Sequence, residues 1–182
     1  MQPAVFLDRD GVINENRADY VKSVAEVEFI PGALESLARL ARRPWPIVLV
    51  TNQSAVGRGL LTLETLEAIH AHMLHHIRAA GGRLDGIYFC PHHPEFQCVC
   101  RKPAPGMLLQ AAAELNIDLR ASVLIGDNAP DVGVARAVGA KPVLVLTGLG
   151  PTQTLIDPSV PRYADLAAVI DALLEMPTPI FK

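Results

Sequence analysis

Short apolar runs recur along the chain and are separated by longer segments with helical periodicity. Each run is bounded by polar or turn-forming residues and is too short for a buried helix, which favours strands. Five buried strands are therefore predicted: Ala4 to Leu7, Ile47 to Val50, Gly86 to Phe89, Val123 to Ile125 and Val143 to Leu146.

Helical patterns occupy the intervals between these runs. The strongest covers about Leu63 to Ala79, where Leu66, Ile69 and Met73 recur on one face. Further helices are expected at about Ala33 to Arg42, after Pro105, after Pro130, and from about Ala164 to Leu174. Because strands alternate with helices, the sequence predicts an α/β fold with a single Rossmann-like parallel sheet and helices on both faces.

Composition limits the possible environments and partners. Of 182 residues, 50% are hydrophobic and only 5% aromatic, so one domain over residues 1–182 with an aliphatic core is expected. The net charge of −3 and the absence of a basic stripe argue against a nucleic-acid partner. Neither a signal peptide at Met1 to Leu7 nor a membrane-spanning run is evident. We expect a cytoplasmic monomer.

Polar side chains stand where the predicted strands end. They are Asp8-Arg9-Asp10-Gly11 after the first strand, Thr51-Asn52-Gln53-Ser54 after the second, Gly126-Asp127-Asn128 after the fourth, and Arg101-Lys102 before the third helix. Ligands of parallel sheets bind beyond the carboxyl ends of the strands, so these groups should converge. Crowded carboxylates usually share a divalent cation, and oxygen ligands suit Mg²⁺. Asp131 is interpreted as a helix cap.

These residues resemble, in order, the four motifs of the haloacid dehalogenase superfamily of phosphatases, over Val5 to about Leu146. The resemblance implies that Asp8 is the nucleophile and Asp10 the general acid/base. It also implies that Asp8, the Asp10 carbonyl and Asp127 hold Mg²⁺, and that Thr51 and Lys102 bind the phosphoryl oxygens. A free Asp has a pKa of about 3.9, so Asp10 should have a raised pKa to donate a proton near neutrality.

All three cysteines of the chain lie in one short segment, residues 90–100, here called the cysteine loop. The set Cys90, His92, Cys98 and Cys100 offers four ligands for a structural Zn²⁺, with His93 as an alternative to His92. A reducing compartment favours metal over disulfides. The loop is similar to that of the heptose bisphosphate and histidinol phosphatases of the superfamily, which favours His92. Bound zinc should fix the adjacent Arg101 and Lys102.

Four other histidines belong to the helix predicted at 63–79: His70, His72, His75 and His76. The i, i+4 spacing of His72 and His76 is compatible with metal binding. Since His75 lies opposite the apolar stripe and His72 flanks it, a solvated face is the expectation for all four.

The intervals between the motifs are filled by the expected strands and helices, so no cap domain is predicted and loops should provide specificity. Segments Asn16 to Lys22, Thr51 to Gly59 and Arg101 are expected to face the substrate. The candidate substrate-binding residues are Asn16, Asp19, Tyr20, Asn52, Gln53, Ser54, Arg101 and Asn128.

Two enzyme branches and one signalling class are compatible with these motifs to different degrees. The motifs resemble the heptose bisphosphate phosphatases most closely, which implies a phosphorylated sugar substrate and a step toward nucleotide-activated heptose. Asn128 stands where that branch often has a basic residue. Histidinol-phosphate phosphatase remains an alternative, because it shares the motifs and the loop. A receiver-like phosphoacceptor is disfavoured, because its acceptor Asp follows the third strand.

Overall fold

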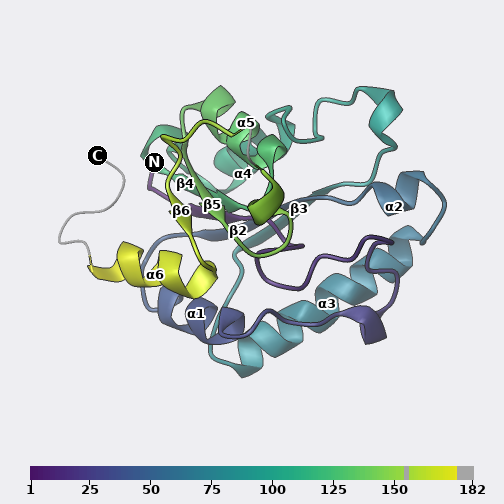
Figure 1. The fold of residues 1–182 in the computed structure, drawn as a ribbon, viewed down its shortest axis with the longest axis horizontal. Coiled ribbons are helices and arrows are strands. Elements are labelled where there is room, and N and C mark those ends of the chain that lie inside the picture. The colour runs from purple at the N-terminus through teal and green to yellow at the C-terminus, as the bar shows by residue number, and fades with distance from the viewer. Residues whose placement is uncertain (154–155, 176–182) are drawn as a thin grey trace.

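The computed structural model describes residues 1–153 and 156–175. Within them, six parallel strands form one sheet in the order β3-β2-β1-β4-β5-β6 (Figure 1). The strands are β1 (Val5–Leu7), β2 (Ile47–Asn52), β3 (Gly86–Cys90), β4 (Val123–Gly126), β5 (Lys141–Val145) and β6 (Arg162–Tyr163). The first strand of the chain therefore lies in the middle of the sheet, between β2 and β4.

Helices connect the strands. The α-helices are α1 (Ala33–Leu40), α2 (Ser54–Gly57), α3 (Leu63–Ala79), α4 (Gly106–Leu115), α5 (Ala129–Val138) and α6 (Leu166–Glu175). Single 3₁₀ turns are found at Val24–Glu26, Pro94–Phe96, Leu119–Ala121 and Gly150–Thr152. None of the helices among the described residues combines the length and apolarity needed to cross a bilayer.

The sheet is covered on both faces, as the sequence predicts (Figure 1). Alternate residues of β1 enter different cores: Val5 and Leu7 pack with helices α1, α3 and α6, whereas Phe6 packs with α4 and α5. Because every strand residue of β1 is buried, the strand reads as a continuous apolar run rather than an alternating one. The predicted α/β class and the single parallel sheet with helices on both faces are confirmed.

The differences from prediction concern short or polar elements. β6 was not expected, because its two residues form no apolar run; they pair with Leu144 and Val145 of β5. β5 begins at Lys141, earlier than predicted, because Lys141 already pairs with β4. Pro142 is tolerated in β5 because β6 does not reach that part of the strand.

Candidate active site

The motif residues meet at the carboxyl edge of the sheet. Asp8 follows β1 directly, Thr51 lies near the end of β2, and Asp127 follows β4. Since β1 pairs with both β2 and β4, the fold itself places Asp8 between the other two residues. A cavity of about 240 Å³ opens there and contains Asp8, Asp10, Asn16, Arg17, Tyr20, Thr51, Asn52, Ser54, Arg58, Arg101, Lys102, Asp127, Asn128, Pro130, Asp131 and Leu149 in its lining.

Lys102 is the buried cation of this cavity. Its Nζ lies 2.9 Å from Oδ1 of Asp8 and 2.6 Å from Oδ1 of Asp131, and it donates to the Val50 carbonyl at 2.8 Å. Burial works to lower the pKa of Lys102, but the negative charges of Asp131 and Asp8 outweigh it and hold that pKa above its ordinary value. Lys102 is therefore a fixed positive charge beside Asp8.

Asp131 has a second role that sequence reasoning missed. It is the expected cap, because its Oδ2 accepts the Asn128 N–H at 3.2 Å within a capping box of α5. Its other oxygen, however, pairs with Lys102, and the carboxyl is buried. The only sequence signal was the second acid of Gly126-Asp127-Asn128-Ala129-Pro130-Asp131, which a helix start also explains.

Three carboxylates converge without a balancing number of cations. One oxygen each of Asp8, Asp127 and Asp131 lie within 4.8 Å of one another. Burial, followed by the charge of Asp8, raises the pKa of Asp127 to about 7, even though Leu149 N–H donates to it at 2.7 Å. Burial likewise raises the pKa of Asp131 to about 6 against the pull of Lys102. Such an oxygen set with excess negative charge fits a divalent cation such as Mg²⁺.

Two glycines let the backbone close around Asp127. A Cβ at Gly11 would lie 2.3 Å from Asp127 Oδ2, and one at Gly148 would lie 2.4 Å from the same atom. Both glycines also have positive φ, at +81° and +59°. Side chains at either position would therefore displace the carboxyl of the predicted metal ligand.

Asp10 is held by several donors. Oδ1 accepts from Arg9 Nε at 3.1 Å, Arg9 Nη2 at 2.9 Å and Asn14 Nδ2 at 2.9 Å, and Oδ2 accepts from Gln53 Nε2 at 2.9 Å. Burial works to raise the pKa of Asp10, but the Arg9 charge and these hydrogen bonds together lower it. The expectation of a raised Asp10 pKa is therefore wrong, because Arg9 was not recognised as a partner.

The candidate substrate-binding residues divide into two groups. The cavity lining includes Asn16, Tyr20, Asn52, Ser54, Arg101 and Asn128. Asp19 and Gln53 do not belong to the lining. Asp19 is exposed and pairs with Lys22 at 2.6 Å, and the buried Gln53 bonds Asp10 and Thr51. Their sequence neighbours Tyr20, Asn52 and Ser54 face the cavity. The ion pair with Lys22 draws Asp19 away from it, and the hydrogen bonds to Asp10 and Thr51 hold Gln53 beneath it.

Asn52 has its amide already engaged. Its Nδ2 donates to the Lys102 carbonyl at 3.1 Å, and its Oδ1 accepts the Lys102 N–H at 3.0 Å. Although Asn52 lines the cavity, both ends of its amide bind the backbone that carries Lys102. This side chain therefore connects the end of β2 to the segment that follows the cysteine loop.

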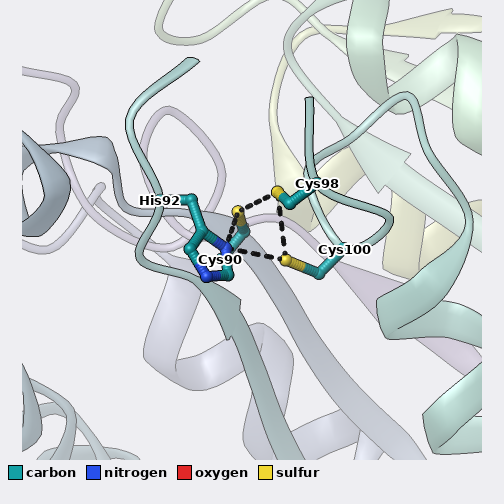
Figure 2. A group of neighbouring side chains, drawn as sticks. All are labelled: Cys90, His92, Cys98 and Cys100. Atoms are coloured by element: carbon teal, nitrogen blue, oxygen red, sulfur yellow. Dashed lines mark hydrogen bonds between the residues drawn. The ribbon is translucent and has the colours of Figure 1, made fainter. Parts of the chain in front are cut away.

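The four side chains of the cysteine loop converge (Figure 2). Cys90 Sγ lies 3.4 Å from Cys98 Sγ and 3.6 Å from His92 Nδ1, and Cys100 Sγ lies 3.3 Å from Cys98 Sγ and 3.2 Å from His92 Nδ1. A tetrahedron with Zn–S bonds of about 2.3 Å has edges of about 3.8 Å, so the donor set is close to that geometry. His93 faces elsewhere, because its Nδ1 accepts the Glu95 N–H at 3.3 Å.

The cysteine loop contacts the segment after β2 through its backbone. Gln53 N–H donates to the Cys90 carbonyl, and Gly57 N–H donates to the Pro91 carbonyl, both at 2.8 Å. The loop therefore borders the cavity on two sides, through α2 and through Arg101 and Lys102.

His70 contradicts the expected solvated face. It is only 6% exposed, and its Nε2 lies 3.5 Å from Nη1 of Arg9. Burial, followed by the Arg9 charge, lowers the pKa of His70 to about 4. His70 belongs to the buried side of α3, together with Ile69 and Met73 of the apolar stripe. His75 is exposed as expected, whereas His72 and His76 are half-buried.

Comparisons with known proteins agree with this geometry. A family model described as HAD-hydrolase-like matches residues 99–175. The D-glycero-beta-D-manno-heptose-1,7-bisphosphate 7-phosphatases of Pseudomonas aeruginosa and Bordetella bronchiseptica are each 42% identical, covering 94% of this chain and 97% of their own length. A crystal structure of the B. bronchiseptica D,D-heptose 1,7-bisphosphate phosphatase with magnesium and phosphate superposes with a TM-score of 0.90 at 40% identity, covering 95% of this chain and 98% of that one.

Proposed function

Because the chain belongs to the heptose-1,7-bisphosphate 7-phosphatase family of HAD-like hydrolases, we propose that it hydrolyses the 7-phosphate of D-glycero-D-manno-heptose 1,7-bisphosphate through an aspartyl-phosphate on Asp8. Membership makes it a phosphomonoester hydrolase. The observation that carries the proposed mechanism is the placement of Lys102 Nζ 2.9 Å from Oδ1 of Asp8, at the floor of the cavity.

The residues support a two-step reaction. A carboxylate oxygen of Asp8 attacks phosphorus, the bond between phosphorus and the sugar oxygen breaks, and Asp10 gives its proton to that oxygen. Water then attacks the phosphorus while Asp10 takes its proton, which releases inorganic phosphate and restores Asp8. The lowered pKa of Asp10 favours its ionised form, which the second step needs. The negative charge of bound substrate favours the protonated form needed for the first.

We propose Mg²⁺ at Asp8, Asp127 and the Asp10 backbone carbonyl. Support comes from the excess of carboxylates at this edge and from the magnesium in the related B. bronchiseptica structure. The ion would neutralise charge on the transferring phosphoryl group. Lys102 and Thr51 would bind other oxygens of the same group, and Asp131 would keep Lys102 in place.

Arginines in the lining support a bisphosphate substrate over histidinol phosphate. Arg17, Arg58 and Arg101 all belong to the lining, and Nη1 of Arg101 is buried without a hydrogen-bond partner among the described residues. Guanidinium groups bind a second phosphate well and repel the amine of histidinol phosphate. We propose that these arginines bind the second phosphate, with Asn16, Tyr20, Ser54 and Asn128 as further substrate contacts.

The cysteine loop is proposed to hold a structural Zn²⁺ at Cys90, His92, Cys98 and Cys100. Four protein ligands leave no open position, so the ion would have no direct part in the reaction. Its role would be to fix the loop whose last ligand precedes Arg101 and Lys102.

A substrate comparison tests the assignment. The kcat/KM for heptose 1,7-bisphosphate should exceed that for histidinol phosphate by at least about 100-fold. Arg58→Ala should raise KM for the bisphosphate by about tenfold, the equivalent of about 1.4 kcal/mol, because a charged hydrogen bond is lost. Arg42→Ala, outside the cavity lining, is the matched control. Equal or better turnover of histidinol phosphate would reject the proposed substrate.

A further inference from the structure

Arg9 is an arginine buried next to the reacting groups without reaching them. Its side chain is 1% exposed, and neither Arg9 nor His70 belongs to the described lining of the cavity. Its Nε and Nη2 both face the Asp10 carboxyl, with Nη2 2.9 Å from each carboxylate oxygen. This forked contact fixes both the position and the rotation of the carboxyl plane.

The remaining end of the Arg9 guanidinium faces His70. Arginine carries only donors, so the 3.5 Å contact between Arg9 Nη1 and His70 Nε2 requires the histidine nitrogen to accept. The imidazole is then neutral, with its proton on Nδ1. Its ring also lies 5.4 Å from the ring of Phe89, between α3 and β3. His70 thus occupies the far side of Arg9, opposite Asp10.

From this arrangement we infer that Arg9 and His70 are positioning residues for the Asp10 acid/base. His70, on the buried side of α3, orients Arg9, and Arg9 orients the Asp10 carboxyl. The inference rests on the proposed role of Asp10. Arg9 holds the carboxyl in the orientation from which it serves the leaving oxygen. His70 holds Arg9 by giving the outer Nη1 an acceptor where water is excluded.

Other contacts of Asp10 do not make Arg9 redundant. Asn14 donates to Oδ1 and Gln53 to Oδ2, but both are neutral amides, and neither contacts both oxygens as Nη2 of Arg9 does. Gln53 also donates to Thr51, so its amide is shared with a second acceptor. Removing Arg9 would leave the partly buried Asp10 carboxylate without its charged partner. The carboxyl would then adopt more than one orientation.

The test separates proton donation from general loss of structure. The kcat/KM value includes steps only through departure of the leaving group. A sugar alkoxide needs a proton from Asp10, whereas nitrophenolate leaves p-nitrophenyl phosphate without one. We expect Arg9→Met to lower kcat/KM for the sugar bisphosphate at least about tenfold and that for p-nitrophenyl phosphate less than about threefold. Arg9→Lys should recover part of the kcat/KM that Arg9→Met loses on the sugar bisphosphate.

His70→Leu gives a second reading if Arg9→Met does not fold. We expect a selective loss of about three- to tenfold for the sugar bisphosphate and no more than about twofold for the aryl ester. Arg136→Met is the matched control, because it removes an exposed arginine paired with Asp157 at 2.6 Å. Both substrates should be hydrolysed by this variant at wild-type rates.

Asp10→Asn separates failure of the inference from failure of the mechanism. If Asp10→Asn lowers kcat/KM equally for both substrates, Asp10 is not the acid, and the inference is overturned together with the mechanism. Asp10→Asn could instead lower kcat/KM selectively for the sugar bisphosphate. If folded Arg9→Met and His70→Leu then lower kcat/KM for both substrates by the same factor, only the positioning role is overturned. Selective losses in all three variants are the expected result.

Discussion

The carboxyl edge of the sheet, with Asp8, Asp127 and Asp131, and the cysteine loop each gather side chains that could hold a cation, but they are assembled differently. The residues of the edge come from distant parts of the chain and are brought together by the pairing of β1 with β2 and β4. The ligands of the loop lie within 90–100, and three of them are at least partly exposed.

The difference teaches what each region needs for its geometry. Hydrogen-bonded strands and two buried cores fix the edge, so its carboxylates are held together even where their charges repel. Between Cys90, at the end of β3, and Cys100, the described backbone forms only the short turn Pro94–Phe96, and the hydrophobic side chains of Phe96 and Val99 are exposed. We therefore expect a cation to be necessary for chemistry at the edge and for structure in the loop.

The largest expected effect comes from Asp8→Asn. The amide preserves the shape of the side chain but is a far poorer nucleophile, so kcat should fall by at least about 1000-fold. The melting temperature should stay within a few degrees of wild type, because strands rather than this carboxylate build the edge. Phosphate-release assays and thermal unfolding measure the two quantities. Asp19→Asn, an exposed carboxyl outside the lining, is the control and should retain full activity. Residual turnover above a few per cent would contradict the covalent mechanism.

A smaller effect is expected from Cys98→Ser. Zinc content, measured by elemental analysis, should fall from about one ion per chain toward zero, and kcat/KM should fall at least about tenfold as Arg101 and Lys102 lose their positions. Adding Lys102→Ala should cost much less than the product of the two single effects. The melting temperature should change little.

His93→Ala is the matched control for that variant, since His93 neighbours His92 but faces Glu95. It should keep both zinc and activity. Global unfolding of Cys98→Ser would break the comparison, because it would mean that the loop supports the whole sheet.

The smallest expected effect is on the pH dependence of stability, through His70 behind the carboxyl edge rather than through the cysteine loop. The pKa of His70 is lowered to about 4 in the folded protein, from 6.5. Unfolded chains therefore bind more protons between these values, and stability should be lost as the pH falls from about 6.5 toward 4. The contribution is on the order of 1–3 kcal/mol. Chemical denaturation at pH 6.5 and 4.5 should show a smaller acid loss for His70→Leu than for wild type.

His75→Leu on the same helix controls for hydrophobic substitution, because His75 is exposed. Its acid loss should match that of wild type. An unchanged acid loss in His70→Leu would show that His70 is charged, or free to become so, in the folded protein.

Residues whose position follows from strand ends could be predicted from the sequence. Asp8 follows a continuous apolar run, and in a parallel sheet the end of such a run is where ligands bind. The cysteine loop was equally accessible, because its four candidate ligands are close together in the chain. Helix α3 was predicted with the observed bounds because its apolar stripe is long.

What escaped prediction depends on partners distant in sequence. Asp131 reads as a cap until Lys102 is found 2.6 Å away, and Arg9 reads as one more polar residue after the first strand until His70 is found beside it. Asn52 reads as a substrate contact, yet both atoms of its amide bind the Lys102 backbone. Pairing of this kind leaves no periodic pattern. Strand β6 was missed for a similar reason, since its place in the sheet depends on pairing with β5.

The central place of β1 has a consequence for synthesis of the chain. During translation, β1, β2 and β3 can pair as soon as they leave the ribosome, but one edge of β1 stays uncovered until β4 emerges. In the finished protein, the backbone groups of that edge pair with β4, and the three residues of β1 are buried. A nascent chain paused between Cys90 and Val123 would therefore expose a strand edge able to pair with other chains. Once β4 has left the ribosome, it can pair with β1 and cover this edge.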